Sequence, residues 1–149
     1  MKEKKPVVEM ATIRQRLKEA GLRCTTARIA VLKRLMQATK PLSHADVADG
    51  LAPEGFDRVT VFRNLVEFSE IGIASRVDLG DHVWRFELRG EGQHHEADHP
   101  HFVCVDCGEV SCLSEVNVSI KPTRGAKKTV SPVGEITEIV FKGHCTQCS

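Results

Sequence analysis

Four cysteines occur in two closely spaced pairs, Cys104-Val-Asp-Cys107 and Cys145-Thr-Gln-Cys148. Two thiolates three positions apart can bind one ion through a tight turn, and Gly108 would supply the bend after the first pair. Together the pairs offer a closed tetrahedral sulfur set, which suits zinc because zinc needs no open coordination position there. The sequence therefore predicts a structural Zn²⁺ site; the alternative is two unrelated pairs of reduced cysteines.

A second group of potential ligands is rich in nitrogen and oxygen. Five histidines lie between residues 82 and 101, and Glu87 lies among them. His99 and His101 would face the same side of a strand, because side chains alternate along strands. Imidazole and carboxylate suit Fe(II), Zn(II), Mn(II) or Ni(II), and they exchange an ion more readily than four thiolates do. This pattern predicts a sensory metal site.

The sequence lacks the residue patterns typical of enzyme active sites. His94-x-Glu96 followed by a CxxC pair resembles part of a zinc deaminase signature, but Val103 rather than proline precedes Cys104 and the gap is too short. We find no nucleophile beside an obvious base, no glycine-rich phosphate loop and no paired-acid motif in the sequence. We therefore expect a protein that is not an enzyme.

The first part of the chain has the pattern of a winged helix-turn-helix. Apolar spacing predicts two helices separated by Gly21, the second capped by Thr25 or Thr26. Ser43 can cap a short helix that ends before Pro53, and Asp57 can cap a longer helix that ends at Gly72. Period-two alternation then predicts two strands within residues 74–88, around a turn at 79–81.

A helical wheel divides the longer helix into an apolar side and a polar side. Thr60 and Arg63 fall on the polar side, where DNA could be read. The apolar side is expected to hold Val59, Val61, Phe62, Leu65, Val66 and Phe68.

The second part of the chain reads differently. Residues 89–98 are polar and glycine-containing, as a hinge would be. Beyond them we expect a strand leading into the first cysteine pair, a strand at 116–120, a basic loop at 122–132 and a strand leading into the second pair. The predicted fold class is α+β, with a winged-helix domain at 1–88, the hinge at 89–98 and a small α/β or mainly β zinc-binding domain at 99–149.

Charge is unevenly distributed. Residues 1–63 carry 13 Lys and Arg against 7 Asp and Glu, whereas residues 64–149 carry 8 against 13. A basic N-terminal part suits a surface that meets phosphates, although a solvated basic helix face would give the same count. No apolar run approaches the roughly 20 residues of a membrane span, and the start lacks a secretory apolar region. We expect a cytoplasmic protein without membrane association, in which six reduced cysteines favour metal ligation over disulfides.

This succession resembles the ferric uptake regulator family across nearly the whole chain. The residues that carry the resemblance are GLRCTTAR, RVTVFRNL, RFEL, HPHFVCVDCG and GHCTQC. The resemblance implies that residues 99–149 form a dimerisation domain. It also implies that the homodimers bind double-stranded operator DNA when loaded with metal, and that they repress genes of metal uptake or stress response. It matches the four cysteines of the two CxxC pairs to structural zinc ligands, and it matches Glu87, His99 and His101 to three ligands of a regulatory site.

The chain departs from the family pattern in several places. Pro41 stands where relatives often offer a histidine, and His44 is the candidate substitute. Cys112 replaces the acidic ligand expected after the first cysteine pair; a thiolate there would favour zinc over iron, but a small core residue is equally compatible. Glu87 stands in place of the Asp of peroxide-sensing relatives, which weakens a peroxide-sensing interpretation. Residues 114–130 form a poor helix, so a strand could replace the usual dimerisation helix.

The sequence thus predicts a metal-dependent transcriptional repressor, in which a Zn²⁺, Fe²⁺ or Mn²⁺ ion fixes the spacing of two DNA-reading domains. Phe62 could contact a thymine methyl group or pack in the core, and Arg63 could contact DNA or pair with Glu67. The alternatives are a thiol redox or peroxide-responsive protein, and a zinc-binding nucleic-acid module without a switch. The candidate DNA contacts are Thr60, Phe62, Arg63, Arg58, Arg28 and Lys18.

Overall fold

The computed structural model describes residues 7–90, 99–121, 124–125 and 136–149. The chain divides into two compact units, Met1–Glu91 and Gly92–Ser149, which we call unit 1 and unit 2. The division falls inside the segment predicted as a hinge, most of which lies outside the described residues, so the hinge stays a prediction. Among the described residues, no helix combines the length and apolar character needed to cross a bilayer.

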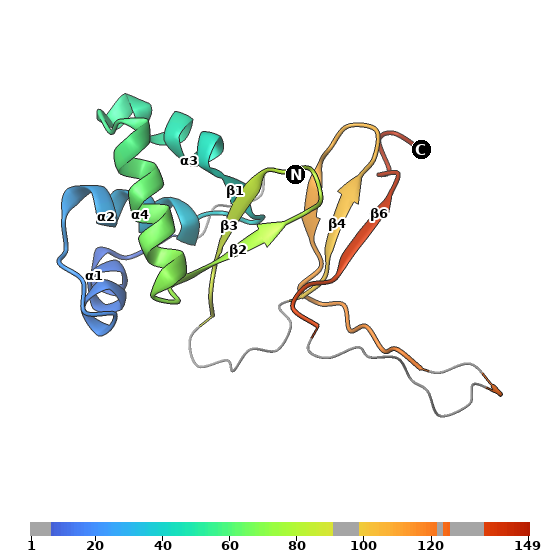
Figure 1. The fold of residues 1–149 in the computed structure, drawn as a ribbon. Coiled ribbons are helices and arrows are strands. Elements are labelled where there is room, and N and C mark those ends of the chain that lie inside the picture. The colour runs from blue at the N-terminus through green and yellow to red at the C-terminus, as the bar shows by residue number, and fades with distance from the viewer. Residues whose placement is uncertain (1–6, 91–98, 122–123, 126–135) are drawn as a thin grey trace. The chain divides into compact units, whose positions relative to one another are not determined.

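Four α-helices build most of unit 1: α1 (Met10–Glu19), α2 (Thr26–Met36), α3 (His44–Leu51) and α4 (Arg58–Glu70) (Figure 1). A short 3₁₀ helix, Ala52–Glu54, follows α3. The predicted caps are confirmed, because each occupies the last extended residue before its helix. The Thr25 side chain accepts from the Arg28 amide, Ser43 forms a reciprocal capping box with Asp46, and Asp57 accepts from the Thr60 amide.

A small antiparallel sheet completes unit 1. It consists of β1 (Leu42–Ser43), β2 (Ala74–Asp78) and β3 (Trp84–Leu88), in the order β1-β3-β2. Strands β2 and β3 form the hairpin that the alternating pattern predicted, with Arg76 opposite Phe86. Helices α1 to α4 and this hairpin together form the predicted winged helix-turn-helix (Figure 1).

Unit 1 has one hydrophobic core between its helices and the hairpin. Helix α4 contributes Val61, Leu65 and Phe68, each fully buried. Complete burial of such a side chain contributes roughly 1.5–3 kcal/mol, so these three residues hold α4 in place. The apolar side predicted by the wheel is too broad, because Val59 and Phe62 are 58% and 47% exposed.

The described residues of unit 2 form three short strands: β4 (His101–Cys104), β5 (Val110–Cys112) and β6 (Val140–Gly143). Strand β4 is central; it pairs antiparallel with β5 and parallel with β6. In its described part the regular structure is all strand, which matches the mainly β expectation.

The prediction of a strand at residues 116–120 is wrong. These residues are irregular, and Val116, Val118 and Ile120 are exposed. Alternating side chains stabilise a strand only where a neighbouring strand pairs with its backbone, and no described segment does so here.

Candidate metal centres and nucleic-acid-binding surface

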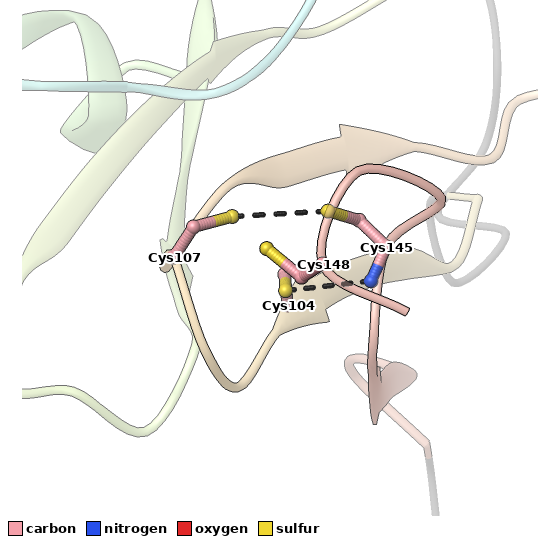
Figure 2. A group of neighbouring side chains, drawn as sticks. All are labelled: Cys104, Cys107, Cys145 and Cys148. Carbon is pink, nitrogen blue, oxygen red and sulfur yellow. Dashed lines mark hydrogen bonds between the residues drawn. The ribbon is translucent and has the colours of Figure 1, made fainter.

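The two CxxC pairs meet at one end of the unit 2 sheet. Because β4 and β6 run parallel, with Cys104 opposite Gly143, the turns that follow the two strands lie at the same edge. The sulfur atoms of Cys104, Cys107, Cys145 and Cys148 all lie within 4.8 Å of one another, and Figure 2 shows them converging on one point. Their grouping agrees with the sequence prediction.

The sulfur spacing suits a tetrahedral ion. The Cys107 and Cys145 sulfur atoms are 3.9 Å apart. Two corners of a tetrahedron with Zn–S bonds of about 2.3 Å lie about 3.8 Å apart. Gly108 directly follows the first pair with a φ of 71°, a conformation that glycine adopts without steric cost. The donor set therefore fits a structural zinc ion.

Backbone amides prepare part of the site for a cation. The Cys107 and Cys145 amides lower the pKa of the Cys104 thiol to about 6, and the Cys145 amide donates to the Cys104 sulfur at 3.4 Å. The neighbouring Cys145 and Cys107 thiols instead raise the pKa of Cys148 to about 12. Four adjacent thiolates repel one another, so a bound cation is needed before all four can ionise, and binding must release protons.

A polar contact that sequence reasoning missed joins the two cysteine pairs. The His144 Nδ1 and Asp106 Oδ2 atoms lie 2.5 Å apart. Asp106 directly precedes Cys107 and His144 directly precedes Cys145, so this contact holds the two turns together. Each residue is ordinary by itself, and their positions beside the cysteines are the only sequence signal.

The second group of ligands lies at the other end of β4. The Cys112 sulfur lies 2.6 Å from the His99 Nε2 atom, and the rings of His99 and His101 are 5.1 Å apart. His101 is 2% exposed and stands opposite Cys112 in the β4–β5 register. Each of the three side chains offers a ligand atom within 4.8 Å of the others. The structure thus brings together three of the predicted regulatory ligands.

Two further predicted ligands belong to unit 1. Glu87 lies half-buried on β3, opposite Ser75 of β2. The His44 Nε2 atom lies 2.8 Å from the Arg58 carbonyl oxygen, and its ring contacts Phe62. Through these contacts His44 links α3 to α4. They do not support metal binding by His44, which stays a prediction. The other histidines of the cluster are His82, at an exposed position of the wing turn, and His94 and His95, which lie outside the described residues.

Helix α4 presents a mixed apolar and basic surface to solvent. Val59, Phe62 and Arg63 are all exposed there. Thr60 is half-buried, and its hydroxyl donates to the Asp57 carboxylate at 2.6 Å. Two exposed apolar side chains on one helix suit contact with thymine methyl groups, and arginine suits guanine or phosphate. Phe62 therefore belongs to the exposed surface, and Val59 is a candidate contact that the wheel assigned to the core.

The basic residues predicted to meet phosphates differ in availability. Arg28 donates two hydrogen bonds to the Glu67 carboxylate, at 2.9 and 3.1 Å, and its side chain is 20% exposed. This placement argues against Arg28 as a phosphate contact: it ties α2 to α4. It also shows that Glu67 pairs with Arg28 rather than with Arg63. Arg58 is exposed and pairs with Asp49, and Lys18 is exposed on α1.

The chain is similar to known regulators over most of its length. The sequence pattern of the Ferric uptake regulator family matches residues 19–132. The chain is 40% identical over 99 residues to the ferric uptake regulation protein of Legionella pneumophila, covering 64% of this chain and 69% of that one. It is 31% identical over 135 residues to that of Cupriavidus metallidurans, covering 88% and 90%.

A solved structure gives the same result. The ferric uptake regulator of Vibrio cholerae matches with a TM-score of 0.62 and 26% identity, over 89% of this chain and 98% of that one. The chain therefore belongs to the ferric uptake regulator family of metal-responsive transcriptional regulators.

Proposed function

We propose that this chain represses transcription as a homodimer on operator DNA, and that a divalent ion favours the DNA-binding arrangement. The ligands of the sensed ion would be His99, His101 and Cys112 of unit 2, with Glu87 of unit 1 as a fourth. The observation that carries the proposal is the His99–His101–Cys112 cluster. Unit 2 thus holds a second donor set beside its four cysteines, and mixed donors bind an ion less permanently than four thiolates do.

The two donor sets would have different roles. The four cysteines of unit 2 suit a permanently bound zinc ion that links β4 to β6. The mixed set suits an exchangeable Zn²⁺, Fe²⁺ or Mn²⁺ ion. Residues 1–88 would then bind DNA, residues 99–149 would bind metal and form the dimer, and residues 89–98 would join the two.

The switch we propose is a shift between arrangements of the two units. An ion that binds Glu87 on the wing together with His99 and His101 restricts how unit 1 is oriented on unit 2. To move an equilibrium from 1:99 to 99:1, the ion must bind the favoured arrangement about 10⁴-fold more tightly. A ligand set drawn from both units provides that difference, because ligands that belong to one unit alone would bind equally well in any arrangement.

The DNA contacts we propose lie on α4 and around it. Val59 and Phe62 would meet thymine methyl groups, and Arg63 would meet guanine or phosphate, with Thr60 beside it. Arg58 and Lys18 would contact phosphates, which adds affinity and salt dependence but little sequence preference. Arg28 would act indirectly, by holding α4 on α2. Binding to DNA would place the site of action in the cytoplasm.

Exposed apolar side chains of unit 2 support the homodimer. The described residues of unit 2 include few buried side chains, and a partner subunit would cover further apolar surface. The exposed set comprises Val105, Val116, Val118, Ile120, Ile136 and Phe141.

The test is a DNA-binding titration with and without added ion. DNA duplexes are first enriched from a randomised pool with ion-loaded protein. A mild chelator then empties the exchangeable site of fresh protein and leaves the cysteine-bound zinc in place. We expect Zn²⁺, Fe²⁺ or Mn²⁺ to restore tight binding to the enriched duplex, and we expect His99→Ala/His101→Ala to abolish that effect. The variant must retain about one tightly held zinc per chain, which shows that unit 2 is intact.

The same experiment separates the alternatives. A zinc-binding module without a switch predicts the same DNA affinity with and without added ion, which would refute the proposal. A thiol redox protein predicts catalytic turnover, an accessible cysteine of low pKa without bound metal, and no enriched duplex.

A further inference from the structure

His99, His101 and Cys112 form a cluster that we call the mixed cluster. Its sulfur ligand, Cys112, distinguishes it from a site made only of nitrogen and oxygen ligands. His101 and Cys112 are register partners on β4 and β5, and directly opposed residues project their side chains from the same face of a sheet. Cys112 is half-buried, and its sulfur lies 2.6 Å from the His99 Nε2 atom. Its thiol thus faces two imidazoles, whereas a core cysteine would face apolar side chains.

The ligand atoms have the spacing of donors around one ion. A Zn–S and a Zn–N bond together span about 4.4 Å, so two donors of one zinc ion can be no further apart than that. The three atoms lie within 4.8 Å of one another, so small shifts of the side chains would bring all three to bonding distance.

This cluster is separate from the four-cysteine site. His101 begins β4 and Cys104 ends it. Three residues of extended strand cover about 10 Å, which is more than one ion can bridge. Cys112 is therefore available to the mixed cluster and is not a spare ligand of the cysteine site.

We propose that Cys112 binds the sensed ion as a thiolate and that this ligand makes the regulatory site select Zn(II) over Fe(II) and Mn(II). The inference rests on the function proposed above, since it takes His99 and His101 as ligands of the sensed ion. Thiolate is a soft ligand that favours zinc, whereas carboxylate suits harder ions such as Mn(II). On binding, the thiol proton passes to solvent as the sulfur–metal bond forms, and no electron is transferred.

The test uses cobalt as a spectroscopic probe in the full-length protein. With the cysteine site filled by zinc and the mixed site emptied, Co(II) is titrated in. We expect a near-ultraviolet sulfur-to-cobalt charge-transfer band that Cys112→Ser and Cys112→Asp abolish. Cys24→Ser is the matched control, because Cys24 lies in unit 1 near the Arg14 carbonyl, and it should leave the band unchanged.

Competition between metals gives the second readout. Cys112→Asp should lower the preference for Zn(II) over Mn(II) by at least about tenfold, because a change of a hydrogen-bond partner outside the ligand shell already costs about that much affinity and Cys112 is itself a proposed ligand. The inference is wrong if the wild-type cobalt spectrum lacks the sulfur band, or if Cys112→Asp keeps the wild-type metal preference. If Cys112→Asp loses the cysteine-bound zinc, that variant is misfolded. Cys112→Ser then replaces it in both measurements, the cobalt spectrum and the competition between Zn(II) and Mn(II).

Failure of this inference can be told apart from failure of the proposed function. If added ion still switches DNA binding but the sulfur band is missing, Cys112 is not a ligand and the switch stands. If the sulfur band is present but DNA binding ignores the ion, the site binds as inferred and the switch is wrong.

Discussion

Loss of the four-cysteine zinc site should unfold unit 2 and leave unit 1 intact. The perturbation is Cys145→Ser/Cys148→Ser, which removes the sulfur ligands that follow β6. Cys107 and Cys145 are 38 positions apart, and a cross-link that closes a loop of that length restricts the unfolded chain by about 4 kcal/mol. The variant lacks this cross-link and therefore loses its stabilisation.

The described part of unit 2 has little burial to offset that loss. Val110 is its one buried aliphatic side chain, alongside Cys104, His101 and Pro100. Complete burial of a valine contributes roughly 1.5–3 kcal/mol, less than the cross-link does. Unit 1, in contrast, has a continuous core that includes Phe68 and Phe86. We therefore expect β6 to separate from β4 while α4 stays folded.

Hydrogen–deuterium exchange read by mass spectrometry measures both units in one sample. We expect fast exchange at residues 101–104 and 140–143 of the variant and unchanged protection in α4. Protein concentration is varied under reducing conditions, so that stabilisation by a partner subunit, which grows with concentration, is separated from stabilisation by zinc. Protection of β4 and β6 that survives the double substitution at low concentration would refute the reasoning.

Three further predictions concern unit 1. Phe68→Ala should lower the free energy of unfolding by about 3–5 kcal/mol, because Phe68 is fully buried on α4. Urea denaturation followed by the helical circular dichroism signal measures this change. A loss below about 1 kcal/mol would contradict the described packing of Phe68. Asp57→Ala should cost about 1 kcal/mol in the same assay through loss of the α4 cap, whereas Asp57→Ser should be nearly neutral. Hydrogen bonds from Arg85 lower the pKa of Asp81 to about 2, so their stabilisation of the wing is present above pH 4 and lost as the pH falls toward 2. Because the pair is partly exposed, this loss should stay below about 1 kcal/mol; a pH titration of Trp84 emission should show it, and Asp81→Asn should remove it.

Local signals predicted most of unit 1. The caps Thr25, Ser43 and Asp57 are each read from neighbouring residues, and their helices begin where they should. The wheel failed for Val59 and Phe62 because it gives directions around one helix axis and does not show how much of the helix its neighbours cover.

Contacts between distant residues escaped sequence reasoning. Arg28 and Glu67 are 39 positions apart, and many acidic residues could have paired with that arginine. His144 and Asp106 likewise needed the pairing of β4 with β6 before they could meet. The four cysteines were predictable because their chemistry requires all of them around one ion, whatever chain lies between.

The proposed switch requires that ion binding and DNA binding are coupled, and such coupling is reciprocal. The most direct measurement is the affinity of the exchangeable site for Zn²⁺, by calorimetric titration, with and without the enriched DNA duplex. We predict that the duplex raises the ion affinity by the same factor by which the ion raises the DNA affinity. Equal ion affinities in the two titrations would contradict the account.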